Sequence, residues 1–218
     1  MANLEKMAAF FEARLDGYDD HMLHNIESAT EFYPFTASLL PTEEGAAVLD
    51  LGCGTGLELE FYFGINPTAR ITGIDLSAGM LEALRAKLSA QDITLIQGSY
   101  FETPLEAGKY NAALSVESLH HFTKEQKSGL YRRLLDALTP DGYFILTDYF
   151  APTEADEAFH ASELARLKAE QGIADGEFYH YDTPLTVEHE IQALMDGGFS
   201  KVELLGEWGA TCTLKANK

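Results

Sequence analysis

The chain has 218 residues, of which 46% are hydrophobic, and its 35 acidic residues against 15 basic ones give a formal net charge of −20. This length suits one α/β domain with a sizeable core, and no apolar run in the sequence approaches the roughly 20 residues of a membrane span. Nucleic-acid binding depends largely on Lys and Arg against phosphates, and anionic membranes repel an acidic surface. We therefore predict a small-molecule ligand, with neither nucleic acid nor a membrane as partner, in a monomer or homodimer.

The sequence contains two cysteines, Cys53 and Cys212, and its first residues, Met1 to Lys6, do not resemble an export signal. Two thiols without such a signal are typical of a reducing compartment, so we expect a cytoplasmic protein. The spacing of cysteines and histidines does not resemble a zinc site. His21 and His24 are typical of an exposed helix face, and we expect no metal.

Hydrophobic periodicity and turn residues predict helices that alternate with strands. The first forty residues are predicted as two helical regions, 3–16 and 19–40, the second broken by Pro34. Strands are predicted at 46–51, 70–75, 93–97, 110–116 and 142–149, and helices at 57–64, 78–89 (with Ser77 as N-cap) and 124–138, the last followed by a turn at 140–142. Helices at 153–171 and 187–196 and strands at 200–206 and 209–216 complete the chain.

This order predicts an α/β fold with a doubly wound, Rossmann-like sheet, in which five parallel strands are followed by a C-terminal antiparallel hairpin. We expect residues 1–218 to form a single domain. Within it, residues 1–40 form an N-terminal helical cap, residues 41–150 the ligand-binding core, residues 151–186 a helical insertion that acts as a lid, and residues 187–218 the final helix and hairpin. The cap and the lid should lie over the carboxyl ends of the strands, where ligands bind in such sheets.

The run from Val48 to Gly56 is the most informative segment of the chain. A buried strand carries Asp50 near its end and leads, through glycines at every second position, into a helix. This spacing matches neither the dinucleotide fingerprint G-x-G-x-x-G nor a P-loop. Asp75 follows 19 residues after Gly56, at the end of the second strand, where a carboxylate accepts hydrogen bonds from ribose hydroxyls. These features predict a nucleoside-like ligand with a cationic amino-acid end and no pyrophosphate.

Asp50 to Gly56, Asp75 and the run Leu119-His120-His121-Phe122 resemble the motifs of class I S-adenosylmethionine-dependent methyltransferases that act on small molecules. The resemblance covers residues 45–150 and implies a seven-stranded sheet, S-adenosylmethionine as cofactor and S-adenosylhomocysteine as product. The family often carries an acidic residue after the third strand, where Ser99 stands in this chain. The cofactor-binding residues that the resemblance implies are Asp50, Gly52, Cys53, Gly54, Gly56, Asp75, Leu76, Met80, Ser99, Tyr100, Val116 and Glu117.

The resemblance also implies candidates for catalysis. His120 and His121 are expected to face the methyl acceptor, and Tyr18 resembles the aromatic residue that closes over the cofactor. For each of them, a purely structural role is the alternative. Tyr179, His180 and Tyr181 are predicted to line the acceptor pocket, with packing of the lid onto the sheet as the alternative.

The function that this resemblance implies is in-line transfer of a methyl group to an O, N or C atom of a small molecule. The methyl group of a sulfonium is already activated, so the enzyme contributes mainly alignment, and a base is needed only for a protonated acceptor. One alternative is a cofactor-modifying enzyme, such as a carboxy-S-adenosylmethionine synthase, for which Arg166 is the candidate cation in the lid. A second alternative is a non-catalytic S-adenosylmethionine-binding protein. The glycine spacing argues against a nicotinamide oxidoreductase.

Overall fold

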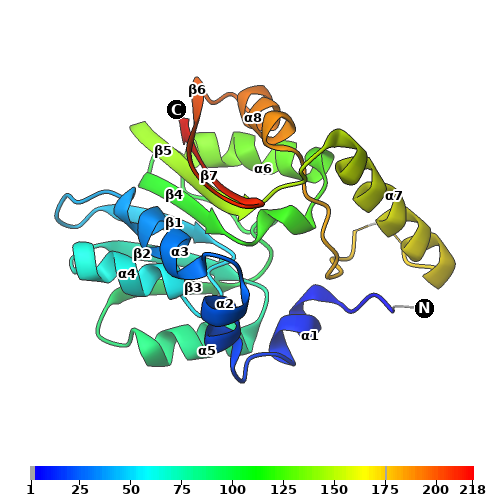
Figure 1. The fold of residues 1–218 in the computed structure, drawn as a ribbon. Coiled ribbons are helices and arrows are strands. Elements are labelled where there is room, and N and C mark those ends of the chain that lie inside the picture. The colour runs from blue at the N-terminus through cyan, green and yellow to red at the C-terminus, as the bar shows by residue number, and fades with distance from the viewer. Residues whose placement is uncertain (1–2, 175) are drawn as a thin grey trace.

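A seven-stranded sheet forms the centre of the computed structural model, which describes residues 3–174 and 176–218 (Figure 1). Its strands are β1 (Ala47–Leu51), β2 (Arg70–Asp75), β3 (Asp92–Gln97), β4 (Tyr110–Val116), β5 (Leu138–Tyr149), β6 (Lys201–Trp208) and β7 (Thr211–Asn217). They lie in the order β3-β2-β1-β4-β5-β7-β6. The first five are parallel, and β7 is antiparallel to both β5 and β6. The predicted doubly wound sheet with its C-terminal hairpin is confirmed.

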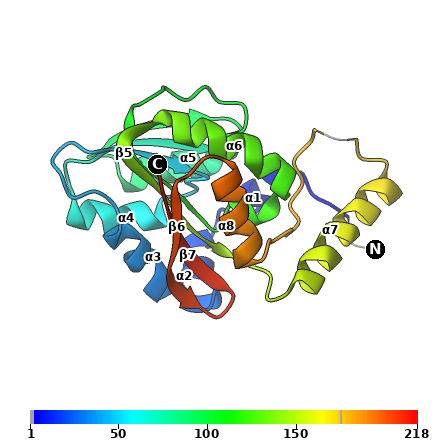
Figure 2. The same cartoon turned by 90° about the horizontal axis from the view of Figure 1, so that it is seen from above.

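Both faces of the sheet are buried, because its central strands carry apolar side chains on both sides. Val48 belongs to the apolar core covered by α3 (Ala29–Ser38) and α4 (Leu57–Ile65). Leu49 and Leu51 belong to the core covered by α6 (Lys124–Ala137) and α8 (Val187–Asp196). Successive residues of a strand point to opposite faces, so neighbouring residues of β1 serve two cores. Figure 2 shows α3 and α4 on one side of the sheet and α6 on the other.

The other helices are α1 (Met7–Glu12), α2 (Tyr18–Asn25), α5 (Ala78–Lys87), α7 (Glu154–Gln171) and the short 3-10 helix η1 (Leu119–His121). The predicted N-cap of α5 is confirmed, since Ser77 Oγ accepts a hydrogen bond from the Met80 N–H (3.2 Å). Thr123 and Gln126 form a capping box that begins α6. Within residues 3–174 and 176–218, the structure contains no helix with the length and apolar character needed to cross a membrane.

The predicted helix break at Pro34 is wrong. The break lies instead at residues 26–28, where Ser28 has a φ of 58°, and Pro34 lies inside α3. Proline removes one helical hydrogen bond, whose acceptor would be the carbonyl of Thr30. Thr30 is exposed, so water can satisfy that carbonyl and the helix continues past the proline.

The predicted turn at residues 140–142 is part of a strand. Helix α6 ends at Ala137, and β5 begins at the next residue. Between Leu138, which pairs with Tyr110, and Tyr143, which pairs with Ala112, the register with β4 shifts. The turn residues therefore form a bulge within the strand, which is where a sheet accommodates proline and glycine.

The N-terminal segment and the segment after α7 pair with each other. Lys6 and Tyr179 form an isolated antiparallel bridge. The Met7 N–H donates to the Phe178 carbonyl (3.0 Å), and the His180 N–H donates to the Glu5 carbonyl (2.9 Å). In Figure 1 the blue N-terminal segment runs toward α7, which stands apart from the sheet. These bonds join the cap to the lid.

Candidate active site

The glycine loop connects β1 to α4 through backbone that requires glycine. Gly52, Gly54 and Gly56 all have positive φ, at 75°, 47° and 76°. A Cβ at Gly52 would lie 2.2 Å from Ser118 Oγ, so the loop after β4 packs directly against this turn. A Cβ at Gly54 would meet nothing closer than the Gly52 carbonyl at 4.0 Å. The middle of the loop thus presents open backbone to a ligand.

Cys53 contributes only its backbone to this loop. Its side chain is buried, and a Cβ added to Gly73 of the neighbouring strand β2 would lie 2.8 Å from the Cys53 sulfur. The Cys53 N–H and the Gly52 N–H both donate to the Ile74 carbonyl, at 3.2 and 2.8 Å. These bonds fix the loop beside the end of β2.

Asp75 ties the end of β2 to the glycine loop. Its Oδ2 accepts from the Gly54 N–H (3.0 Å) and its Oδ1 from the Ser77 N–H (2.8 Å). Burial raises the pKa of Asp75. A carboxylate has about four lone-pair sites, so acceptor capacity remains for hydroxyls of a ligand. Of the next two predicted cofactor-binding residues, Leu76 is half-buried and Met80 is fully buried in the core.

Asp50 and Glu58 form a buried carboxyl pair beneath the loop. Within the described residues, Asp50 Oδ2 and Glu58 Oε1 have no hydrogen-bond partner. Burial, followed by the neighbouring Glu58, raises the pKa of Asp50, and burial raises the pKa of Glu58. Two such carboxyls need either a shared proton or a cation. Glu58 was not among the predicted site residues, and its signal is one of two carboxylates in the first turn of an apolar helix.

The residues after β3 are engaged in local structure. Ser99 Oγ accepts from the Phe101 N–H (3.2 Å), which is a turn contact. Tyr100 is buried, and its hydroxyl lies 3.1 Å from Ser118 Oγ in a hydrogen bond. Tyr100 therefore packs against the glycine loop, where a Cβ at Gly52 would lie 3.6 Å from its ring, whereas Ser99 belongs to the turn after β3.

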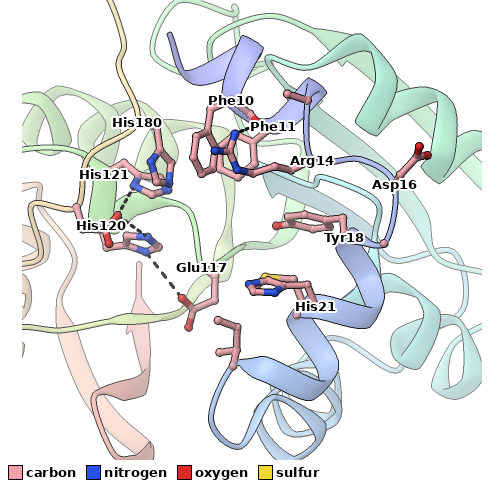
Figure 3. A pocket seen from close by; sticks show the side chains of 15 residues that line it. Phe10, Phe11, Arg14, Asp16, Tyr18, His21, Glu117, His120, His121 and His180 are labelled. Atoms are coloured by element: carbon pink, nitrogen blue, oxygen red, sulfur yellow. Dashed lines mark hydrogen bonds and ion pairs between the residues drawn. The ribbon is translucent and has the colours of Figure 1, made fainter. Parts of the chain in front are cut away.

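A cavity of about 630 Å³ lies between the N-terminal cap and the loop after β4. Figure 3 shows its two walls facing each other. One wall comes from the cap, and the other comes from the end of β4, from η1 and from the segment after α7. The labelled residues of the two walls are Phe10, Phe11, Arg14, Asp16, Tyr18 and His21 on the first and Glu117, His120, His121 and His180 on the second.

Tyr18 and its neighbour connect the cavity to the glycine loop. Tyr18 lines the cavity, and burial together with the carboxylates of Glu58 and Asp75 raises the pKa of its hydroxyl above the usual range. The hydroxyl therefore stays protonated at neutral pH. Asp19 accepts a hydrogen bond from the Thr55 hydroxyl of the loop. The first turn of α2 thus closes over both regions.

Glu117 follows β4 in a left-handed conformation, with a φ of 49°. Its Oε1 accepts from the Thr211 hydroxyl (3.1 Å), and its Oε2 lies 3.9 Å from His120 Nδ1. Burial raises the pKa of Glu117 to about 7, although the positive charge of His120 opposes this and Asp148 supports it. Glu117 therefore changes protonation state near neutral pH. Val116, the residue before it, is buried in the core.

His120 is held by a carboxylate that the sequence analysis missed. His120 Nδ1 lies 2.5 Å from Asp148 Oδ1, and Asp148 Oδ2 accepts from the N–H groups of Leu119 (2.8 Å) and His120 (3.0 Å). Burial alone would lower the pKa of His120, but Asp148 outweighs it and raises the pKa to about 9. The signal for Asp148 is an acidic residue near the end of an apolar strand, β5, which pairs with β4.

His121 faces a second carboxylate from the segment after α7. Its Nδ1 lies 3.0 Å from Asp182 Oδ1. Burial, and then the charge of His120, lowers the pKa of His121 to about 4. Burial would raise the pKa of Asp182, yet the imidazoles around it hold that pKa below its usual range. His180 stacks on Phe10 with ring centroids 3.4 Å apart and closes this side of the cavity.

The structure does not bring the remaining candidates to this cavity. Tyr179 lines a separate cavity and donates its hydroxyl to Glu177 (2.8 Å). Tyr181 lies beside His160, with ring centroids 6.3 Å apart. Arg166 is half-exposed on α7, where it pairs with Glu163 and Glu170. The cation that does line the cavity is Arg14, which sequence reasoning did not single out.

Comparison with known proteins connects these features to one family. A sequence profile described as a methyltransferase domain matches residues 48–142, which contain the glycine loop, Asp75 and both histidines of η1. (+)-O-methylkolavelool synthase of Herpetosiphon aurantiacus is 28% identical over 144 residues, or 62% of this chain and 50% of that protein. A tRNA (carboxymethyluridine(34)-5-O)-methyltransferase of Saccharomyces cerevisiae is 26% identical over 131 residues, or 59% of this chain and 45% of that protein.

The fold also has a close match among solved structures. A putative O-methyltransferase of Nostoc punctiforme superposes with a TM-score of 0.73 at 22% identity, covering 99% of this chain and 62% of that one. At this identity the match shows the shared fold. The chain spans half or less of the length of the two curated relatives above, so their named activities belong to longer proteins.

Proposed function

Because the chain belongs to the class I S-adenosylmethionine-dependent methyltransferases, we propose that it transfers a methyl group from S-adenosylmethionine to a small molecule held in the 630 Å³ cavity. The observation that supports this most is that the glycine loop and the cavity lie next to each other. Gly52 of the ligand loop packs on Ser118, directly after Glu117 of the cavity wall. The charge of Asp75 also acts on the hydroxyl of Tyr18, which lines the cavity. A donor on the loop would therefore reach an acceptor in the cavity.

The loop fits S-adenosylmethionine in three respects. The open backbone at Gly54 allows close approach of the methionine part. Asp75 retains acceptor capacity for the ribose hydroxyls. The unpartnered oxygens of Asp50 and Glu58 suit the ammonium group of an amino acid, which would replace the shared proton. This last feature distinguishes the proposed ligand from a dinucleotide.

The cavity suits a small acceptor. Its volume lies within the range of small-molecule sites, roughly 300–1,000 Å³. The formal charge of −20 disfavours a nucleic-acid acceptor, although one relative is named for tRNA. The cap and the lid both contribute to the cavity walls, so both would contact the acceptor.

The chemistry needs alignment and one proton acceptor. S-adenosylmethionine supplies a methyl group on a sulfonium, which is already activated. Tyr18 and His180 position the acceptor between the two walls, and His120 is held in one orientation by Asp148. A protonated acceptor loses its proton to Glu117, whose pKa of about 7 suits a base at neutral pH.

Calorimetric titration with S-adenosylmethionine, S-adenosylhomocysteine and NAD tests the ligand. We expect both sulfur compounds to bind and NAD not to bind. Asp75→Asn should weaken binding of the sulfur compounds, whereas Asp92→Asn, a matched change at the exposed start of β3, should not. Binding of NAD alone would refute the proposal.

Methylation assays with a panel of small hydroxyl and amine acceptors, with bulk tRNA run in parallel, test the reaction. Methylation of tRNA alone would refute a small acceptor. Tight cofactor binding without turnover on any acceptor would favour the non-catalytic alternative. Mass analysis of the cofactor product separates S-adenosylhomocysteine from a carboxylated derivative.

A further inference from the structure

Three potential metal ligands converge on one wall of the cavity. His120 Nε2 lies 3.7 Å and His121 Nδ1 lies 3.0 Å from the same atom, Asp182 Oδ1. All three atoms lie within 4.8 Å of one another. Figure 3 shows both imidazoles on the wall opposite Tyr18. Two imidazoles and one carboxylate at these distances are an arrangement typical of transition-metal sites.

Two of these atoms are buried without a hydrogen bond. His121 is only 7% exposed, and in the described part of the chain neither its Nδ1 nor Asp182 Oδ1 has a hydrogen-bond partner. The two atoms approach each other to 3.0 Å but are not aligned for a hydrogen bond. A simple histidine–aspartate pair would align the N–H with the carboxylate. Here both atoms are left able to bind a third partner.

The third ligand is oriented by contacts behind it. Asp148 binds His120 at Nδ1 and is itself held by two backbone N–H groups, so the Nε2 of His120 is directed toward Asp182. A carboxylate behind a histidine is the usual support of a metal-binding imidazole. The Thr183 N–H donates to the His120 carbonyl (2.7 Å) and thereby fixes the segment that carries Asp182.

We infer that His120 Nε2, His121 Nδ1 and Asp182 Oδ1 bind a divalent transition-metal ion, such as Zn²⁺, Mn²⁺, Fe²⁺ or Co²⁺. Metal–ligand bonds of about 2.1 Å allow two ligands of one ion to lie up to about 4.2 Å apart, and small side-chain movements suffice here. Imidazole ligands favour these ions over Mg²⁺ or Ca²⁺. The alternative set with Glu117 and Asp148 is less suitable, because His120 Nδ1 is already bonded to Asp148.

The proposed site differs from the expectation of no metal that the sequence suggested. The histidines considered there, His21 and His24, lie on α2, whereas the converging ligands come from η1 and from a segment about sixty residues later. All three ligands line the cavity, so an ion held by them would be accessible to an acceptor there.

The role of the ion rests on the proposed function. An acceptor oxygen bound to the ion would be a hydroxyl or an enol, whose O–H bond the metal weakens. The proton of this acceptor would pass to Glu117 while the new O–CH₃ bond formed and the S–CH₃ bond of the cofactor broke, leaving neutral S-adenosylhomocysteine. The site thus points to O-methylation of an acceptor that can coordinate a metal.

Metal titration of the full, tag-free chain after chelator treatment tests the site. At about pH 8, where the ion must displace the proton of His120, we expect Co²⁺ to bind with one equivalent and to produce visible absorption bands. Calorimetry with Zn²⁺ gives the affinity. His121→Gln and Asp182→Asn should each weaken binding at least ~10-fold. His24→Gln is the matched control, because His24 is an exposed histidine 3.1 Å from the Asp20 carboxylate, and it should bind like the parent.

Absence of a one-equivalent metal complex in the parent chain would overturn the inference, and so would equal affinity in the two ligand variants. The same samples are titrated with S-adenosylmethionine. Intact cofactor binding without metal binding refutes the metal site alone and shows that the chain is folded. Metal binding without cofactor binding refutes the proposed function and leaves the metal site standing.

Discussion

Substitution of Glu117 by Gln should stabilise the protein at alkaline pH while it impairs catalysis. Burial raises the pKa of this carboxyl from 4.5 to about 7, and its side chain is only 11% exposed. One pKa unit corresponds to about 1.4 kcal/mol, so ionising Glu117 costs about 3 kcal/mol more in the folded protein than in the unfolded chain. Glutamine keeps an oxygen for the Thr211 hydroxyl but carries no charge.

The sign of the effect follows from the raised pKa. Below about pH 4.5 the carboxyl is neutral in both states, so the parent and Glu117→Gln should have similar free energies of unfolding. Between pH 4.5 and 7 the unfolded chain releases the proton first, and the parent loses stability. Above pH 7 the variant should be more stable by up to about 3 kcal/mol.

Urea denaturation at several pH values from 5 to 8 measures this difference. Glu82→Gln, at an exposed position of α5, is the matched control and should shift stability by the same small amount at every pH. The parent's methylation rate on a protonated acceptor should rise as pH increases through about 7, and this dependence should disappear in Glu117→Gln. A variant without added stability at pH 8, or a parent rate that is flat across pH 7, would refute the reasoning.

Two further substitutions test the fold around the site. Gly52→Ala should destabilise the protein by about 2 kcal/mol and weaken cofactor binding, because its Cβ would meet Ser118 Oγ at 2.2 Å. Denaturation and calorimetry measure the two effects. The control is Gly45→Ala, which is also at positive φ but has nothing within 4 Å, so it should show only a backbone cost of about 1 kcal/mol. Lys127→Met should lower the free energy of unfolding by about 3–5 kcal/mol, because it leaves the buried Glu190 carboxylate, 2.5 Å away, without its positively charged partner. Lys124→Met, at a partly exposed position of the same helix, should leave the urea midpoint nearly unchanged.

Local patterns were sufficient to predict the sheet. Strands β2 and β4 begin and end at the predicted residues, because turn residues on both sides of an apolar run define where the strand begins and ends. The glycine loop was also predictable, since three glycines at every second position match the positive φ values observed there. Pro34 shows the limit of such rules, because a helix whose other residues pack well tolerates one missing hydrogen bond.

The partners of the predicted site residues were not predictable in the same way. His120 and His121 were found from a local motif, but Asp148 and Asp182 lie 28 and 61 residues from their histidines along the chain. Only the parallel pairing of β4 with β5 and the path of the lid bring them together. Tyr179 and His180 are neighbours in sequence, yet they line different cavities because this extended segment directs alternate side chains to opposite sides.

The backbone bonds between the N-terminal segment and the segment after α7 make the two covers of the cavity a single mechanical unit. Neither cover can swing open while residues 5–7 stay paired with residues 178–180. The hydrogen bond from the Thr55 hydroxyl to Asp19 also connects this unit to the glycine loop. A cofactor bound at the loop would therefore affect the position of the cap. The two substrates should therefore bind in a fixed order, cofactor first, and the opening that releases the methylated product should set the turnover rate.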